Sequence, residues 1–129
     1  MNVNIETRCE REQVFDDDAN TPKAHLWRVT STAPLTGKWQ NTRKVVVTTH
    51  WTYRFCIEAG GWYWPEGALV TEAACFDAGD AAGRLLYHWH ARPTSASRLT
   101  KAAVCQQHEK VLAEQMDVFI AKAEKLPIL

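Results

Sequence analysis

The clearest pattern of hydrophobic and polar positions lies in residues 43–58, where β-branched and aromatic residues alternate with polar ones. A period of two residues is typical of a strand with one buried face. We therefore predict a long central strand. Its core face carries Val45, Val47, Thr49, Trp51, Tyr53, Phe55 and Ile57, and its polar, cationic face carries Lys44, Val46, Thr48, His50, Thr52, Arg54 and Cys56.

Shorter segments of the same kind predict further strands. Residues 2–7 alternate, and a second strand begins at Ala24 and ends before Ala33, with Trp27 and Val29 on one face. Residues 8–23 between them are acidic, lack apolar periodicity and end in Pro22, which predicts a loop or connector.

A turn at residues 59–61, rich in glycine, predicts a hairpin between the long strand and a short arm at residues 62–64 that stops at Pro65. Residues 68–76 continue the sheet in one interpretation, while their alanines leave a helix open. Glu58, Glu66 and Glu72 flank this hairpin. They could act as an acid and a base, but nothing in the sequence sets their separation, and the alternative is that they are solvated loop charges.

The C-terminal region predicts a long helix. A boundary rich in capping residues at 94–97 precedes it, and it extends from about residue 97 or 98 to 125, before Pro127. One stripe is apolar and faces the sheet, namely Leu112, Met116, Phe119, Ile120 and Ala123. The opposite stripe is charged, namely Lys101, Lys110, Glu114, Asp117 and Lys122.

Residues 77–91 fit two structures. As a strand, they place His88 and His90 on one face, the H-x-H arrangement of metal sites. As a helix, they place Leu85, Leu86 and Trp89 on one stripe and turn the two histidines about 200° apart. We favour a helix over 78–91, although Gly79 and Gly83 weaken it.

Together these elements predict one α+β domain over residues 1–129. A mostly antiparallel sheet of four or five strands is packed by the long C-terminal helix and by one shorter helix. The composition, 46% hydrophobic and 23% charged, is that of an ordinary globular protein. With no leader-like start and no apolar run of membrane length, we expect a cytoplasmic protein with no membrane association.

The four cysteines, at positions 9, 56, 75 and 105, show no C-x-x-C spacing, so we expect free thiols. Cys105 and His108 lie three residues apart on the predicted helix. They could form a thiolate and its base, but such a pair is more often a packed thiol beside a boundary histidine. The chain has no dinucleotide, P-loop, nucleophile-elbow or H-E-x-x-H motif. We therefore predict no catalytic residue, no metal ligand and no cofactor.

Charge is segregated along the chain although the total is zero. Residues 1–22 have a net charge of −4, residues 23–56 of +6, residues 57–92 of −3 and residues 93–129 of +1. One interpretation is that folding sets the acidic segment against the basic one. The other is that the basic segment forms a binding surface for an anionic partner.

The candidate partner-binding residues come from this basic segment and from the Trp-rich turn. They are Arg28, Lys38, Trp39, Arg43, Lys44, His50, Arg54, Trp62 and Trp64. We predict a non-catalytic binding or inhibitor module that recognises a protein or another anionic partner, since Trp and Arg dominate interface energetics. Homodimerisation stays an alternative.

Two other functions remain open at this stage. A nucleic-acid-binding domain would use the same basic face. A small metal-dependent or ligand-binding domain would be built on His50, His88 and His90.

Overall fold

The computed structural model describes residues 5–15, 22–35, 42–57, 60–77, 84–91, 94–95 and 100–126. They form β1 (Glu6–Phe15), β2 (Pro22–Pro34), β3 (Arg43–Ile57), β4 (Gly60–Asp77), β5 (Arg84–His90), β6 (Thr94–Ser95) and α1 (Lys101–Lys125). The sheet order is β1-β2-β3-β4-β5, every neighbouring pair is antiparallel, and β6 pairs with β4. The predicted α+β fold with an antiparallel sheet and a C-terminal helix is confirmed.

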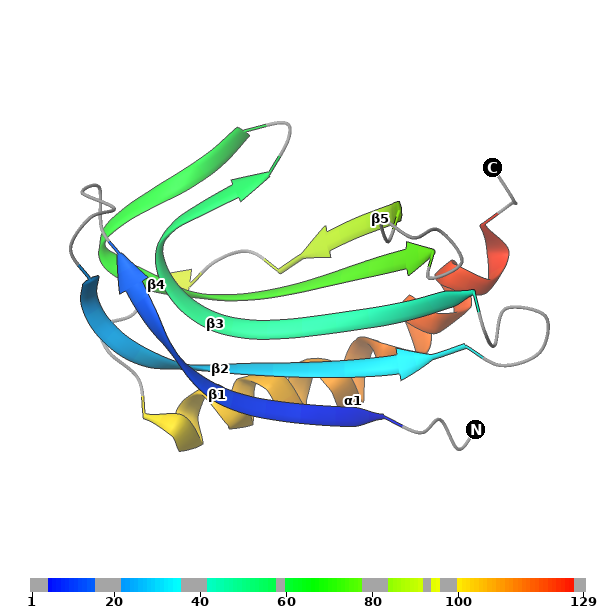
Figure 1. Cartoon of the computed structure of the whole chain (residues 1–129), viewed down its shortest axis with the longest axis horizontal. Helices are drawn as coiled ribbons and strands as arrows, with labels where there is room; N and C mark the ends of the chain where they lie inside the picture. Colours follow the sequence, from blue (N-terminus) through cyan, green and yellow to red (C-terminus); the bar gives the residue numbers. More distant parts are fainter. Residues whose placement is uncertain are drawn as a thin grey trace.

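Helix α1 runs along one face of the sheet (Figure 1). The predicted core face of β3 is confirmed where its side chains are described, because Val45, Val47, Thr49 and Trp51 are all buried. The predicted apolar stripe of the helix packs against this core face. Its residues Met116, Phe119, Ile120 and Ala123 are buried, and Leu112 packs against the same cluster. We call the opposite side of the sheet, which is turned away from α1, the outer face.

Both ends of α1 are fixed by hydrogen bonds. At the N-terminus, the Thr100 side chain accepts a hydrogen bond from the Ala103 backbone N–H, so the helix begins three or four residues later than predicted. Near the C-terminus, the buried Arg43 guanidinium donates to the carbonyl oxygens of Ala123 (2.7 Å) and Leu126 (2.6 Å). No helix in the described residues has the length and hydropathy that a membrane span requires.

The prediction of a shorter helix over 78–91 was wrong for its described part, because residues 84–90 form strand β5. Pairing with β4 satisfies the backbone groups on one side of this segment and places Trp89 opposite Ala73 and Tyr87 opposite Cys75. The Trp89 ring lies 4.9 Å from the Phe119 ring on α1. Edge pairing and aromatic packing outweigh a helical spacing that two glycines already weakened. Residues 78–83 lie outside the described part.

Other boundaries also differ from prediction, and β2 spans Pro22–Pro34 instead of beginning at Ala24 and ending before Ala33. Strand β1 extends to Phe15, so residues 8–15 of the predicted acidic loop are paired with β2, while 16–21 lie outside the described residues. Strand β4 does not stop at Pro65. Its register with β3 shifts between Thr52 and Arg54, opposite the segment that contains Pro65, so this proline removes no ladder hydrogen bond. Figure 1 shows the outer part of this hairpin turning sharply away from the sheet.

Candidate functional site on the outer face

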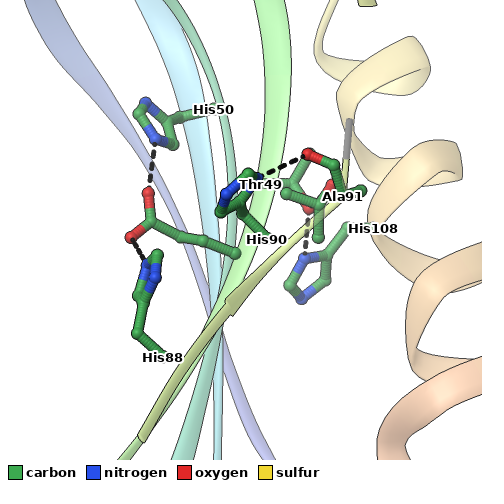
Figure 2. A network of polar contacts seen from close by, with 8 residues as sticks. Thr49, His50, His88, His90, Ala91 and His108 are labelled. Carbon is green, nitrogen blue, oxygen red and sulfur yellow. Dashed lines mark hydrogen bonds and ion pairs between the residues drawn. The ribbon is translucent and has the colours of Figure 1, made fainter. Parts of the chain in front are cut away.

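Three titratable side chains from three neighbouring strands meet on the outer face. His50 of β3 donates from Nε2 to Oε2 of Glu72 on β4, at 3.2 Å, and His88 of β5 donates from Nε2 to Oε1 of the same carboxylate, at 3.1 Å. Figure 2 shows His50 and His88 on either side of the carboxylate. We call His50, Glu72 and His88 the outer-face cluster.

Strand register explains why these residues meet. Glu72 lies directly opposite Thr48 on one side and His90 on the other. Directly paired residues share a face, and so do residues two apart on one strand. His50 and His88 are therefore the diagonal neighbours of Glu72, within reach of its two oxygens.

The outer-face cluster is half-buried rather than fully solvated. The side chains of His50, Glu72 and His88 are 12%, 28% and 26% exposed. Next to them on the same face, Val70 is fully buried and Thr48 is 7% exposed. The cluster therefore lies at the margin of a packed region, where its hydrogen bonds are less screened by water than they would be on an open surface.

The two imidazoles control the charge of the carboxylate. Burial alone raises the pKa of Glu72, but the hydrogen bonds from His50 and His88 and their charges outweigh burial, and the net effect is a lowered pKa. Glu72 is thus a carboxylate at neutral pH, and it fixes the orientation of both rings. The neighbouring His90 ring lies 6.0 Å from that of His88, and its Nδ1 donates to the Ala91 carbonyl oxygen.

The structure gives the predicted basic residues different positions. Arg28 lies directly opposite His50 and directly opposite Glu10, so it joins the outer face next to the cluster. Lys44 is exposed on the same face, farther along β3. Arg43 is only 3% exposed and binds the end of α1, so it belongs to the junction of sheet and helix rather than to a surface.

The other predicted residues lie wholly or partly outside the described part of the chain. Lys38 and Trp39 lie outside the described residues. Arg54, Trp62 and Trp64 lie in β3 and β4, but their side chains are outside the described part. The pairing of Glu10 with Arg28 also places the acidic and basic segments of the chain side by side, as the first interpretation of the charge pattern expected.

A second polar cluster lies between the sheet and α1 (Figure 2). His108 is 1% exposed, with Nε2 2.7 Å from Ser31 Oγ and Nδ1 2.9 Å from Thr49 Oγ1. Thr49 Oγ1 in turn lies 3.0 Å from Thr71 Oγ1, and Ser31 Oγ lies 2.8 Å from Thr7 Oγ1. Burial lowers the pKa of His108 to about 4, so its imidazole is neutral at physiological pH. This group joins helix to sheet and is not open to a ligand.

Sequence reasoning identified His50 and His88 but did not place Glu72 with them. The signal was present in β4. Ala68, Val70, Ala74 and Phe76 share one phase of the strand, and Glu72 is the charged residue among them. A charge at a half-buried strand position requires a partner.

The donor set of the outer-face cluster, two imidazoles and a carboxylate, is also one that zinc and iron use. Within the described ranges, however, no group of three or more His, Cys, Asp or Glu side chains has the arrangement that holds a metal ion. Comparison with protein-family models, with curated proteins and with solved structures found no match.

Proposed function

We propose that the protein is a non-catalytic binding module that recognises an acidic segment of a partner protein through the outer face of the sheet. The observation that carries this proposal is the Glu72 carboxylate bridged by His50 and His88. Helix α1 packs with the hydrophobic core against the other face, whereas the three side chains of the outer-face cluster are partly exposed, so a partner can contact them there.

The charge of this surface supports an acidic partner. Glu10 and Arg28, which are paired across β1 and β2, balance each other on this face, so with neutral imidazoles Glu72 gives the whole set a net charge of one negative. Histidine is the side chain that takes up protons closest to neutral pH. Protonation of both His50 and His88 changes the net charge of this set from one negative to one positive. Attraction to carboxylates should therefore strengthen as pH falls.

The geometry favours recognition over acid–base catalysis. Each oxygen of Glu72 already accepts a hydrogen bond from an imidazole, so the carboxylate holds the two rings in place. Fixed, half-buried polar groups are suited to selecting a partner because little ordering entropy is lost when the partner binds.

The test is a titration of isotope-labelled protein with a short polyglutamate peptide at pH 6 and pH 8, followed by amide chemical shifts. We expect changes along β3, β4 and β5 near the cluster, with tighter binding at pH 6. The His50→Gln/His88→Gln variant should lose about three- to tenfold in affinity at pH 6 and most of the pH dependence. Lys110→Gln, on the exposed side of α1, is the matched control and should bind as the wild type does.

Two outcomes contradict the proposal. Shift changes confined to α1, or no binding at either pH, would exclude this surface. In the same assay, a single-stranded oligonucleotide that binds more tightly than the peptide, with affinity that falls steeply as salt rises, would replace the proposal with nucleic-acid binding.

A further inference from the structure

Two thiols from opposite ends of the chain meet at the edge of the molecule. Cys9 lies on β1 and is exposed, and Cys105 lies near the start of α1 and is partly buried. The two thiols are close enough that Cys9 contributes to raising the pKa of Cys105. The pair connects an edge strand of the sheet with the helix that covers it.

Contacts on either side of the pair also place Cys9 and Cys105 near each other. On α1, Lys101 packs its ammonium 4.9 Å from the Trp27 ring of β2, and His108 lies 2.7 Å from Ser31 of β2. On α1, Cys105 lies between Lys101 and His108. On β2, Val29 lies between Trp27 and Ser31, and Val29 is the cross-strand partner of Cys9.

The two elements also advance at matching rates. Two strand residues advance about 6.6 Å, and three or four helix residues advance about 5 to 6 Å. Each step along the helix therefore meets the next inward-facing position of the sheet. The position that Cys105 meets is that of Cys9 and Val29.

We propose that Cys9 and Cys105 are a modification site that forms a reversible disulfide bond and locks β1 onto α1. With a small-molecule disulfide such as oxidised glutathione as the oxidant, the exposed Cys9 thiolate attacks one glutathione sulfur and releases one glutathione thiolate. The Cys105 thiolate then attacks Cys9 Sγ and releases the second. The protein loses two thiol protons and two electrons, and one glutathione disulfide becomes two thiols.

The local environment sets the conditions for this reaction. Burial raises the pKa of the Cys105 thiol, and the adjacent Cys9 adds to that effect. Ring closure therefore depends on a thiol that ionises late, and we expect disulfide formation to accelerate as pH rises from 7 toward 9.

Strand β1 is the element that such a bond would change. Residues 5–11 are all exposed, and in the sheet β1 pairs with β2. A covalent link to α1 would suppress opening of this edge. Because it also closes a loop of most of the chain, it should raise the melting temperature by roughly 5 °C or more.

The test uses full-length protein incubated with oxidised glutathione, digested without reduction and analysed by mass spectrometry. We expect a cross-linked pair of peptides that contain Cys9 and Cys105, together lighter by two hydrogen atoms. Slower amide hydrogen exchange in β1 and the higher melting temperature should accompany it, and dithiothreitol should reverse all three.

Three variants distinguish this bond from other thiol chemistry. Cys9→Ser and Cys105→Ser should each abolish the cross-link and the shift in melting temperature, whereas Cys56→Ser should keep both. Cys75 is fully buried and should remain unreactive. The proposal is overturned if wild-type protein gives only glutathione adducts, if the cross-link joins Cys56 to another cysteine, or if a Cys9→Ser variant still gains stability on oxidation.

Discussion

Nδ1 of His108 on α1 lies 2.9 Å from Oγ1 of Thr49 on β3, and through Nε2 the same ring lies 2.7 Å from Ser31 Oγ on β2. Both ring nitrogens are therefore used, and both partners are hydroxyl groups that accept or donate as the neutral ring requires. A protonated ring would need an acceptor at each nitrogen and would place a charge in a site that is 1% exposed.

This contact predicts that stability falls in mildly acidic solution. The pKa of His108 is lowered by burial to about 4 in the folded protein, against 6.5 as its ordinary value. Between pH 6.5 and pH 4 the unfolded chain binds a proton at His108 that the folded chain does not. The free energy of unfolding therefore decreases as pH falls through this window, by about 3 kcal/mol in total from this one group.

Urea unfolding of wild-type and His108→Gln proteins at pH 7, 5.5 and 4.5 measures the effect. The variant loses hydrogen bonds and should be less stable at pH 7. The difference in the free energy of unfolding between the two proteins should become smaller toward pH 4.5, because only the wild type loses the stability linked to His108. His90→Gln is the control, and its difference from wild type should not narrow in this way. A constant difference between wild type and His108→Gln would show that His108 titrates normally.

The contact between Arg43 and the last turn of α1 gives a second prediction. Arg43→Met keeps much of the buried side-chain volume but removes two charge-assisted hydrogen bonds to the Ala123 and Leu126 carbonyl oxygens. We expect a loss of about 2 to 4 kcal/mol in the free energy of unfolding. Amide exchange should also accelerate at the C-terminal end of α1. Arg43→Lys, which keeps the charge, should lose less, and equal losses in the two variants would contradict a hydrogen-bonding role.

The sequence predicted what depends on local periodicity. Strand β3 and helix α1 are long and strongly patterned, and their faces agree with the prediction where side chains are described, down to Thr49 on the core side. Segment 84–90 was predicted to be a helix because Leu85, Leu86 and Trp89 fit a helical stripe. In the structure it pairs with the edge of β4, and that edge exists only once the sheet has assembled.

For the candidate site, too, the sequence predicted only what depends on local periodicity. Alternation in β3 placed His50 on the polar face, and alternation in β2 placed Arg28 on the polar face of that strand; in the structure the two residues are directly opposite each other. The meeting of His50 and His88 at Glu72 depends on the β4 register and on the pairing of β5 with β4. The register was not visible in the sequence, and the strand at 84–90 was the less favoured of the two predicted structures. Arg43 was predicted to bind a partner because it belongs to the basic segment of residues 23–56. Its partners are carbonyl groups at the other end of the chain.

Tyr87 supplies a third prediction, at the other contact between β5 and α1. Its hydroxyl donates to the Phe119 carbonyl oxygen at 2.7 Å, and burial raises its pKa above the ordinary value. Tyr87→Phe should lower the free energy of unfolding by about 1 kcal/mol, because a backbone carbonyl loses its side-chain partner. The Lys122 ammonium, 4.7 Å from this ring, should keep its cation–π contact in the variant. Chemical denaturation measures the loss, and Lys122→Met separates the two contributions.

The fourth prediction concerns Gly67, which has a φ of 92° where the register of β4 with β3 shifts. A Cβ atom at this position would lie 1.7 Å from Cζ2 of Trp51, so the indole occupies the space that any larger residue needs. Two costs should add in Gly67→Ala, about 1 kcal/mol for the left-handed backbone and about 2 kcal/mol or more for displacing the buried ring.

A double-mutant cycle separates these two costs. In a Trp51→Ala background the ring is absent, and Gly67→Ala should then cost only the backbone term, about 1 kcal/mol. Since Trp51→Ala is itself expected to cost about 3 to 5 kcal/mol, the measurements belong at low temperature, where the weaker proteins remain folded. Additive losses across the cycle would mean that the indole moves aside without cost and does not fix the bend in the β3–β4 hairpin. A coupling of 2 kcal/mol or more would establish that the close approach of Gly67 to Trp51 sets that bend.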